Sequence, residues 1–358
     1  MLAPDPAQET AAILASYRSA RVLAPFPRRG GTDGARWRRI IRTHERTLAV
    51  LDGRARGRTL PQGRELQAFG RDLFETLLPG DVRRLYDVAR SQQKRSALHL
   101  VFTSMLDWVA DKPWELAFDP SRREFIATSS VNFVRNAHTA VPADSRARRR
   151  GRLRVLVVVS RPRGREPLDS RAETSDLQKA FRTLVHAGRA EIELVTRPTA
   201  AALQRRLAAG DVDVLHFVGH GHFDEAEREG FLVLEDERGD PRPLGAEALR
   251  QVVCQRGLSL VFLNACETAR GGRSDWNRGA APALVAAGVP AVVANQYAVL
   301  DRAATLFARE LYSELASGRA LGDAAREARI ALAGELGTSR IDWAVPVVFA
   351  RDPREPLR

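Results

Sequence analysis

The chain has 358 residues, of which 44% are hydrophobic and 28% are charged. This composition indicates a globular protein with one large or two smaller domains, and it excludes a disordered tail, a collagen-like fibre and a miniprotein held together by disulfides. The two cysteines, Cys254 and Cys266, form no Cys-x-x-Cys pair, which favours a reducing compartment such as the cytoplasm. Asp5 and Glu9 argue against a signal peptide, and we expect no membrane span, because prolines and a glycine interrupt the longest uncharged run, 279–297.

The net charge of +12 comes almost entirely from arginine, since only three of the 56 basic residues are lysines. Arginines occur in every segment with few aromatic residues between them, and the one dense run, 146–154, lies between two apolar segments. We interpret this run as a solvated linker and expect no nucleic-acid partner. None of the lysines follows a glycine, so a P-loop nucleotide-binding site is excluded.

Residues 1–60 are predicted to form a helical N-terminal region. Apolar residues recur at helical spacing over 8–20 and 36–51, and prolines and glycines separate the two stretches. Residues 61–145 are predicted to be the first half of a larger domain, which starts with a helix at 63–78 that a Pro-Gly pair ends.

This first half continues with a short apolar strand at 98–102 and a hairpin-like stretch at 125–133. The basic segment at 142–152 is interpreted as the linker that closes it. Residues 61–145 are thus predicted to contain both helices and strands.

Residues 150–358 alternate regularly between apolar strands and amphipathic helices. Continuous apolar strands separated by helices predict an α/β fold with a doubly wound, mainly parallel sheet that helices cover on both faces. The strands are expected at 155–159, 192–196, 212–218, 258–263, 291–294 and 345–349, and the helices at 170–186, 199–209, 244–255, 280–287, 302–316 and 321–333. In such sheets the functional site lies at the carboxyl ends of the strands.

Two of these strands run directly into reactive side chains. The strand at 212–218 is followed by Gly219, His220 and Gly221, and the strand at 258–263 leads to Cys266. If the two strands are neighbours, an imidazole and a thiol enter the same crevice, which is the minimum for catalysis by a thiol nucleophile. The glycines beside the histidine allow backbone N–H groups to approach a substrate carbonyl.

The same residue types allow other interpretations. A cysteine taken alone is more often a small buried apolar residue than a nucleophile, and His216, inside its strand, is predicted to be a core or supporting residue. His220, His222 and Asp224 have the His-x-His-x-Asp spacing of a metallo-hydrolase, but no histidine follows His222 to complete the ligand set. We therefore expect no metal ion and no other cofactor.

Several segments in order resemble a CHAT-domain peptidase, a bacterial member of the caspase-like cysteine peptidases of clan CD. The likeness extends over about residues 65–352 of the chain. It rests on 113–116 (PWEL), 214–221 (VLHFVGHG), 263–268 (LNACET), 286–294 (AAGVPAVVA), 301–304 (DRAA) and 343–346 (WAVP).

The resemblance implies a role for each matching residue. His220 is similar to the catalytic histidine and Cys266 to the nucleophile, while the N–H groups of Gly221 and Cys266 would form the oxyanion hole. The residue two before the nucleophile, Asn264, would line the substrate pocket, with Glu267 and Asp301 as the acids within reach.

The sequence departs from the family at 295–297, where Asn-Gln-Tyr stands in place of a common Leu-Trp pair. This loop lies near the substrate pocket in the family, so the departure bears on specificity. The loop at 269–278, after the nucleophile, is expected to be mobile and to rearrange on activation.

The family also implies a biological role. We expect a peptidase that cleaves one dedicated protein substrate encoded nearby, that stays latent until a separate sensor or activator protein signals, and that serves a bacterial defence or cell-death system. The arginine bias fits a bacterium with GC-rich DNA. The alternative is a caspase-like scaffold that has lost activity and only binds partners.

Overall fold

A computed structural model describes residues 12–17, 20–25, 39–40, 42–44, 47, 63–93, 96–104, 107–110, 112–136, 151–164, 170–224, 229–254, 256–265, 280–297 and 301–357. The chain divides into two compact units. The smaller unit consists of residues 1–98, 114–131 and 338–341, and the larger unit consists of residues 99–113, 132–337 and 342–358. Each unit is described by itself below.

The smaller unit combines helices with two short antiparallel hairpins. In the first hairpin the strands pair from Ala12 with Pro25 to Tyr17 with Ala20. In the second, Phe118 pairs with Phe125. The elements are β1 (Ala12–Tyr17), β2 (Ala20–Pro25), α3 (Arg64–Leu77), α4 (Gly80–Gln92), η1 (Trp114–Leu116), β4 (Phe118–Asp119), β5 (Glu124–Phe125) and η2 (Ile126–Thr128).

Two sequence predictions in this unit are wrong. The helix expected over 8–20, and with it a purely helical N-terminal region, is contradicted by β1 and β2, which pack against α4. Backbone hydrogen bonds to a neighbouring strand here override the helical spacing of the apolar residues. The hairpin expected at 125–133 lies earlier, between β4 and β5, because the following residues join the large sheet as β6. Within the helix predicted at 36–51, the structure describes residues 39–40, 42–43 and 47 as helical.

The larger unit is built on an eight-stranded sheet with the order β3-β6-β15-β14-β13-β9-β7-β8. Its strands are mainly parallel, although β15 runs antiparallel to β14. The predicted fold class is therefore confirmed. The strands are β3 (Leu98–Thr103), β6 (Val131–Asn136), β7 (Leu153–Val159), β8 (Ala190–Thr196), β9 (Val214–Val218), β13 (Leu260–Asn264), β14 (Ala291–Asn295) and β15 (Pro346–Ala350).

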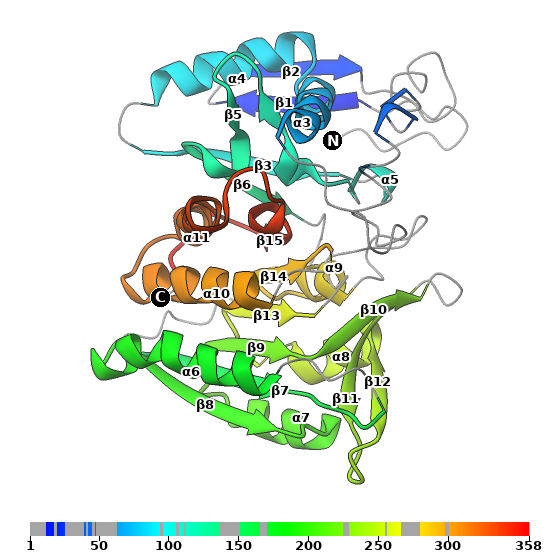
Figure 1. The fold of residues 1–358 in the computed structure, drawn as a ribbon, viewed down its shortest axis with the longest axis vertical. Coiled ribbons are helices and arrows are strands. Elements are labelled where there is room, and N and C mark those ends of the chain that lie inside the picture. The colour runs from blue at the N-terminus through cyan, green and yellow to red at the C-terminus, as the bar shows by residue number, and fades with distance from the viewer. Residues whose placement is uncertain are drawn as a thin grey trace. The chain divides into compact units, whose positions relative to one another are not determined.

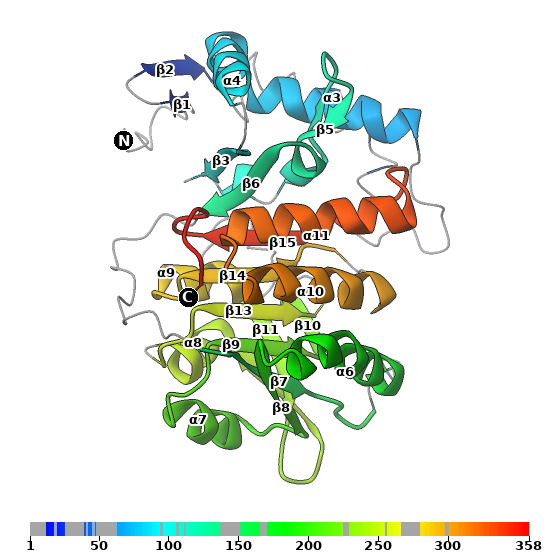
Figure 2. The same ribbon diagram turned by 90° about the vertical axis from the view of Figure 1, so that its left-hand side faces the viewer.

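Helices cover both faces of this sheet (Figures 1 and 2). One face carries α7 (Ala200–Ala208), α8 (Ala246–Val253) and α9 (Ala280–Ala286), and the other carries α6 (Ser170–His186), α10 (Asp301–Ala316) and α11 (Leu321–Leu336). Because both faces are covered, the central strands are apolar on both sides, which is why they read as continuous apolar runs. The short elements α5 (Asp107–Ala110) and η4 (Asp342–Ala344) complete this unit.

A second, three-stranded antiparallel sheet follows β9 directly. It consists of β10 (His220–Asp224), β11 (Glu229–Glu235) and β12 (Pro241–Gly245), in which His220 pairs with Val233. The sequence analysis did not predict these strands. Within the part of the chain that the structure describes, no helix has the length and apolar character needed to cross a membrane.

Two buried arginines lie where β6 meets β15. These strands share a single register pair, Phe349 with Arg135. Arg329 of α11, which is 1% exposed, donates hydrogen bonds to the carbonyl oxygens of Phe133 in β6 at 2.9 Å and Pro346 in β15 at 3.0 Å. The guanidinium thus bonds two backbone carbonyls near the point where the two strands have few ladder bonds of their own.

Candidate active site

The strands that lead to His220 and Cys266 are direct neighbours. β9 and β13 pair in parallel from Val214 with Leu260 to Val218 with Asn264. Their carboxyl ends therefore lie side by side, as the sequence analysis required for a shared crevice. Cys266 itself comes two residues after β13 and, like Glu267, lies outside the described residues.

Backbone hydrogen bonds fix the segment before His220 on both sides. The N–H of Gly219 donates to the carbonyl oxygen of Asn264 at 3.2 Å, and the N–H of Ser160 donates to that of Val218 at 2.9 Å. A Cβ atom at Gly219 would stand 2.7 Å from Cζ of the buried Phe217, so any other residue here would force that ring to shift. The residue after it is therefore held beside the end of β13.

His220 opens the three-stranded sheet and is half-buried. This sheet is anchored in turn to the loop after β7, because the N–H of Arg161 donates to Oε1 of Glu235 at 2.6 Å and the N–H of Arg163 donates to the carbonyl oxygen of Gly239 at 2.9 Å. The imidazole of His220 is thus on an anchored strand and remains partly open to solvent.

The metal-binding alternative gains no support from the described side chains, which do not include that of His222. Among them, no group of three His, Cys, Asp or Glu residues is placed so that it could hold a metal ion. The described side chains of His220 and Asp224 are half-buried in β10.

His216 lies in the core rather than in the crevice. Its side chain is 1% exposed, its Nδ1 is 2.9 Å from the hydroxyl oxygen of Tyr312 in α10, and its ring stacks on Phe262 with 4.5 Å between the ring centroids. Burial lowers the pKa of His216 to about 3, because an apolar surrounding disfavours the charged imidazolium. Of the two roles that the sequence left open, the structure places this residue in the core.

This burial has a consequence for acid stability. The folded-state pKa of about 3 lies below the ordinary value of 6.5, so between these pH values the unfolded chain binds a proton that the folded chain does not. His216 should therefore cost the fold up to about 1.4 kcal/mol for each pH unit below 6.5.

We expect His216→Phe, which keeps a ring against Phe262, to remove this dependence. Between pH 6.5 and pH 5, the free energy of unfolding from urea titrations should fall by about 2 kcal/mol more in the natural protein than in the variant. An equal fall in both proteins would contradict the assignment. The comparison within each protein cancels whatever the substitution costs at neutral pH.

A pair of amides lies beside the site at the carboxyl ends of β13 and β14. Nδ2 of Asn295 donates to Oδ1 of Asn264 at 3.0 Å, and Asn295 is buried while Asn264 is half-buried. The next residue, Gln296, is also buried, and its Oε1 accepts from Nη2 of Arg135 at 3.0 Å. Nη1 of Arg135 donates to the carbonyl oxygen of Ala110 at 2.6 Å.

This arrangement gives Asn295 and Gln296 a structural role. They tie the strand that precedes Cys266 to β14 and, through Arg135, to β6. Asn264 was predicted to line the substrate pocket, but its partner Asn295 was not predicted. The only sequence signal was that both asparagines end apolar strands. Asp301 begins α10, and its side chain lies outside the described residues.

Comparisons with known proteins place this geometry in a family. The sequence matches the CHAT domain model over residues 67–351. Gingipain R (RgpB) of Porphyromonas gingivalis, an Arg-specific cysteine proteinase, has a similar structure, with 12% identity, a TM-score of 0.52, and coverage of 80% of this chain and 71% of that chain.

Two further structures have lower TM-scores. The separase–securin complex of Saccharomyces cerevisiae has 14% identity, a TM-score of 0.42 and coverage of 89% of this chain and 22% of that chain. The Drosophila initiator caspase Dronc has 10% identity, a TM-score of 0.36 and coverage of 62% and 91%. A search of curated proteins finds no match. Because the family model matches more than three quarters of the chain, the chain belongs to the CHAT domain family.

Proposed function

We propose that this protein is a cysteine endopeptidase whose catalytic dyad is His220 and Cys266. The observation that carries the proposal is the parallel register of β9 and β13, together with the hydrogen bond from Gly219 to Asn264. Both hold the residues that precede the histidine and the cysteine side by side. Membership of the CHAT domain family supports the same reaction class.

In the proposed reaction, the imidazole of His220 takes the proton of the Cys266 thiol, and the thiolate attacks the carbonyl carbon of the scissile peptide bond. The N–H groups of Gly221 and Cys266 donate to the oxyanion that forms. His220 then gives its proton to the leaving amine, which departs and leaves a thioester. Water, deprotonated by His220, attacks the thioester, releases the new carboxyl terminus and restores the thiol.

Differential alkylation of the two cysteines tests the dyad. Cys254 is half-buried, and burial raises the pKa of its thiol to about 11, which lowers its thiolate fraction at neutral pH roughly a hundredfold. Iodoacetamide should therefore label Cys266 much faster than Cys254, and His220→Ala should remove the difference. Equal, slow labelling of both thiols in the natural chain would instead support the inactive scaffold.

The pocket beside the nucleophile should not select strongly for a basic residue before the cleaved bond. Asn264 is a neutral amide whose Oδ1 already accepts from Asn295, whereas a buried guanidinium requires a carboxylate. A positional-scanning peptide library is expected to show no sharp Arg or Lys preference, and Asn264→Asp should raise the preference for Arg about tenfold or more.

Glu267 and Asp301 are the acids that could change this result. If either enters the pocket, Arg selectivity should be present in the natural protein and lost in Glu267→Ala or Asp301→Ala. Arg selectivity that survives both substitutions but collapses in Asn264→Ala would contradict the argument that a neutral amide at this position does not select for arginine.

The biological setting completes the proposal. The peptidase acts in the cytoplasm on one protein substrate encoded by a neighbouring gene, stays latent until a separate sensor or activator engages it, and serves a bacterial defence or cell-death system. The loop at 269–278, proposed to rearrange on activation, lies outside the described residues. Co-expression with the neighbouring genes, followed by mass spectrometry of new chain termini, identifies the substrate, with Cys266→Ala as the control.

A further inference from the structure

The large sheet ends in an edge strand that can accept another strand. β8 is the last strand in the sheet order, and among the described residues it pairs only with β7. The N–H and C=O groups of alternate residues along an edge strand point away from the sheet and are available for pairing with another chain. Along β8 the side chains of Ile192 and Leu194 are only half-buried.

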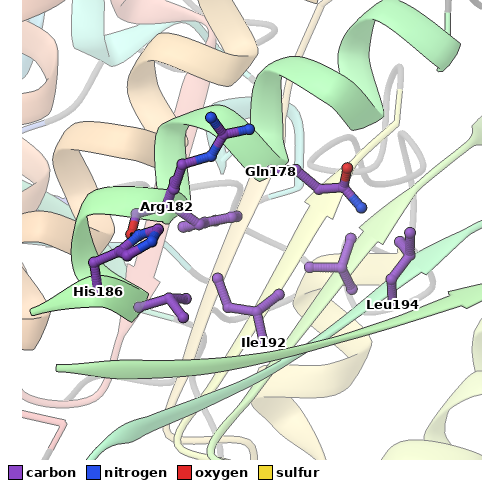
Figure 3. A pocket seen from close by; sticks show the side chains of 8 residues that line it. Gln178, Arg182, His186, Ile192 and Leu194 are labelled. Carbon is purple, nitrogen blue, oxygen red and sulfur yellow. The ribbon is translucent and has the colours of Figure 1, made fainter. Parts of the chain in front are cut away.

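An apolar groove lies between this edge strand and α6. Its volume is about 230 Å³, and it is lined by Phe181 and Val185 of α6 and by Ile192 and Leu194 of β8. Figure 3 shows the side chains of Ile192 and Leu194 rising from the strand towards the helix. Sites for drug-sized ligands are usually larger, roughly 300–1,000 Å³, so this groove suits one or two apolar side chains of a peptide.

The charge around the groove has one sign. Arg182 of α6 lines it, and α6 carries no acidic residue from 178 onward. Arg182 is exposed, and within the described part of the chain its guanidinium makes no hydrogen bond or ion pair. The acidic Glu193 of β8 forms an ion pair with Arg206 of α7, with 2.6 Å between Oε2 and Nη2.

We propose that β8 and the groove beneath α6 form a docking site for an extended segment of a partner protein. The segment adds to the edge of β8 as a further strand, inserts alternate apolar side chains into the groove, and carries a carboxylate that pairs with Arg182. Main-chain hydrogen bonds supply the affinity in this mode, and the groove and the arginine supply the selectivity.

A second copy of this chain is a poorer occupant. Pairing of two β8 edges across a two-fold axis would bring the two α6 helices together, with Arg182 of each near that of the other. Like charges would then face each other without the compensating acid that a different partner supplies. The site lies at an edge strand separated from β9 by β7, so it is distinct from the dyad and does not depend on it.

Peptide binding to the full chain tests the proposal, and the Cys266→Ala variant is used so that no probe is cleaved. The probes are fluorescein-labelled nonapeptides of alternating Val and Thr with one Glu at varied positions, and a matched set with Lys in place of Glu. In fluorescence anisotropy at least one Glu peptide should bind. Its affinity should fall about fivefold or more with Arg182→Glu, which should prefer the Lys counterpart.

Two matched valines give the control. Val185, at the groove, is 45% exposed, and Val88, in α4, is 46% exposed. Val185→Asp should abolish peptide binding, Val88→Asp should leave it unchanged, and bound peptide should slow hydrogen exchange along β8. The proposal is overturned if no probe binds, if Val185→Asp has no effect, or if sedimentation shows a dimer that Val185→Asp dissociates, which would make a second copy the occupant.

Discussion

Cys266→Ala and His220→Ala should each lower kcat/KM for the protein substrate by at least about a thousandfold, because the members of a nucleophile–base pair act as a unit. Neither change should unfold the protein. His220 is half-buried at the start of β10, and the segment before it is held by backbone hydrogen bonds that the substitution leaves in place. Cleavage assays and thermal melting of the same preparations measure the two effects.

Cys254→Ala is the matched control for the nucleophile. Cys254 caps the end of α8, and its raised pKa makes it a poor nucleophile, so the variant should retain activity. Full activity of Cys266→Ala would end the peptidase proposal. Loss of activity in His220→Ala accompanied by a large fall in melting temperature would point to a structural role for the histidine.

Arg329→Met should lower the free energy of unfolding by about 3 kcal/mol. The guanidinium of Arg329 donates to backbone carbonyls in both β6 and β15, and methionine fills a similar volume without donors. Two buried carbonyl oxygens would then lack these partners, and each such group costs about 1–3 kcal/mol, offset in part by removal of a buried charge.

Urea unfolding of Arg329→Met and Arg309→Met provides the comparison. The side chain of Arg309 in α10 is 47% exposed and binds the adjacent Glu310, so its replacement should change stability by less than about 0.5 kcal/mol. Equal, small effects in both variants would show that the buried guanidinium does not hold the two strands together.

The parallel sheet was predictable because each of its strands and helices carries its own signal. The helix expected at 170–186 is α6, and the strand expected at 291–294 is β14, one residue longer. Strands buried on both faces are continuously apolar and stand out from amphipathic helices. His220 and Cys266 follow the strands at 212–218 and 258–263 and have small residues beside them. The sequence therefore predicted both residues at the carboxyl ends of sheet strands, without showing that the two strands pair.

The features that escaped prediction depend on partners far along the chain. β1 has the apolar spacing of a helix and becomes a strand by pairing with β2 and packing against α4. The hydrogen bond between Asn264 and Asn295, and the contact of Arg329 with Phe133, join residues whose proximity no local pattern encodes. Sequence periodicity shows which face of an element is buried but not which side chain it meets there.

The order of strands in the large sheet also sets the order in which the chain can fold. Among the described strands, β6 has only β3 and β15 as neighbours, and about 200 residues separate the end of β6 from the start of β15. A ribosome needs roughly 10 to 40 seconds to add that many residues, and throughout that time β3 and β6 have no sheet to join. The strands from β7 to β14 form a contiguous block that can assemble earlier. The link from Arg135 to Gln296 therefore closes late in synthesis, after the block that holds the hydrogen bond between Asn264 and Asn295 can form.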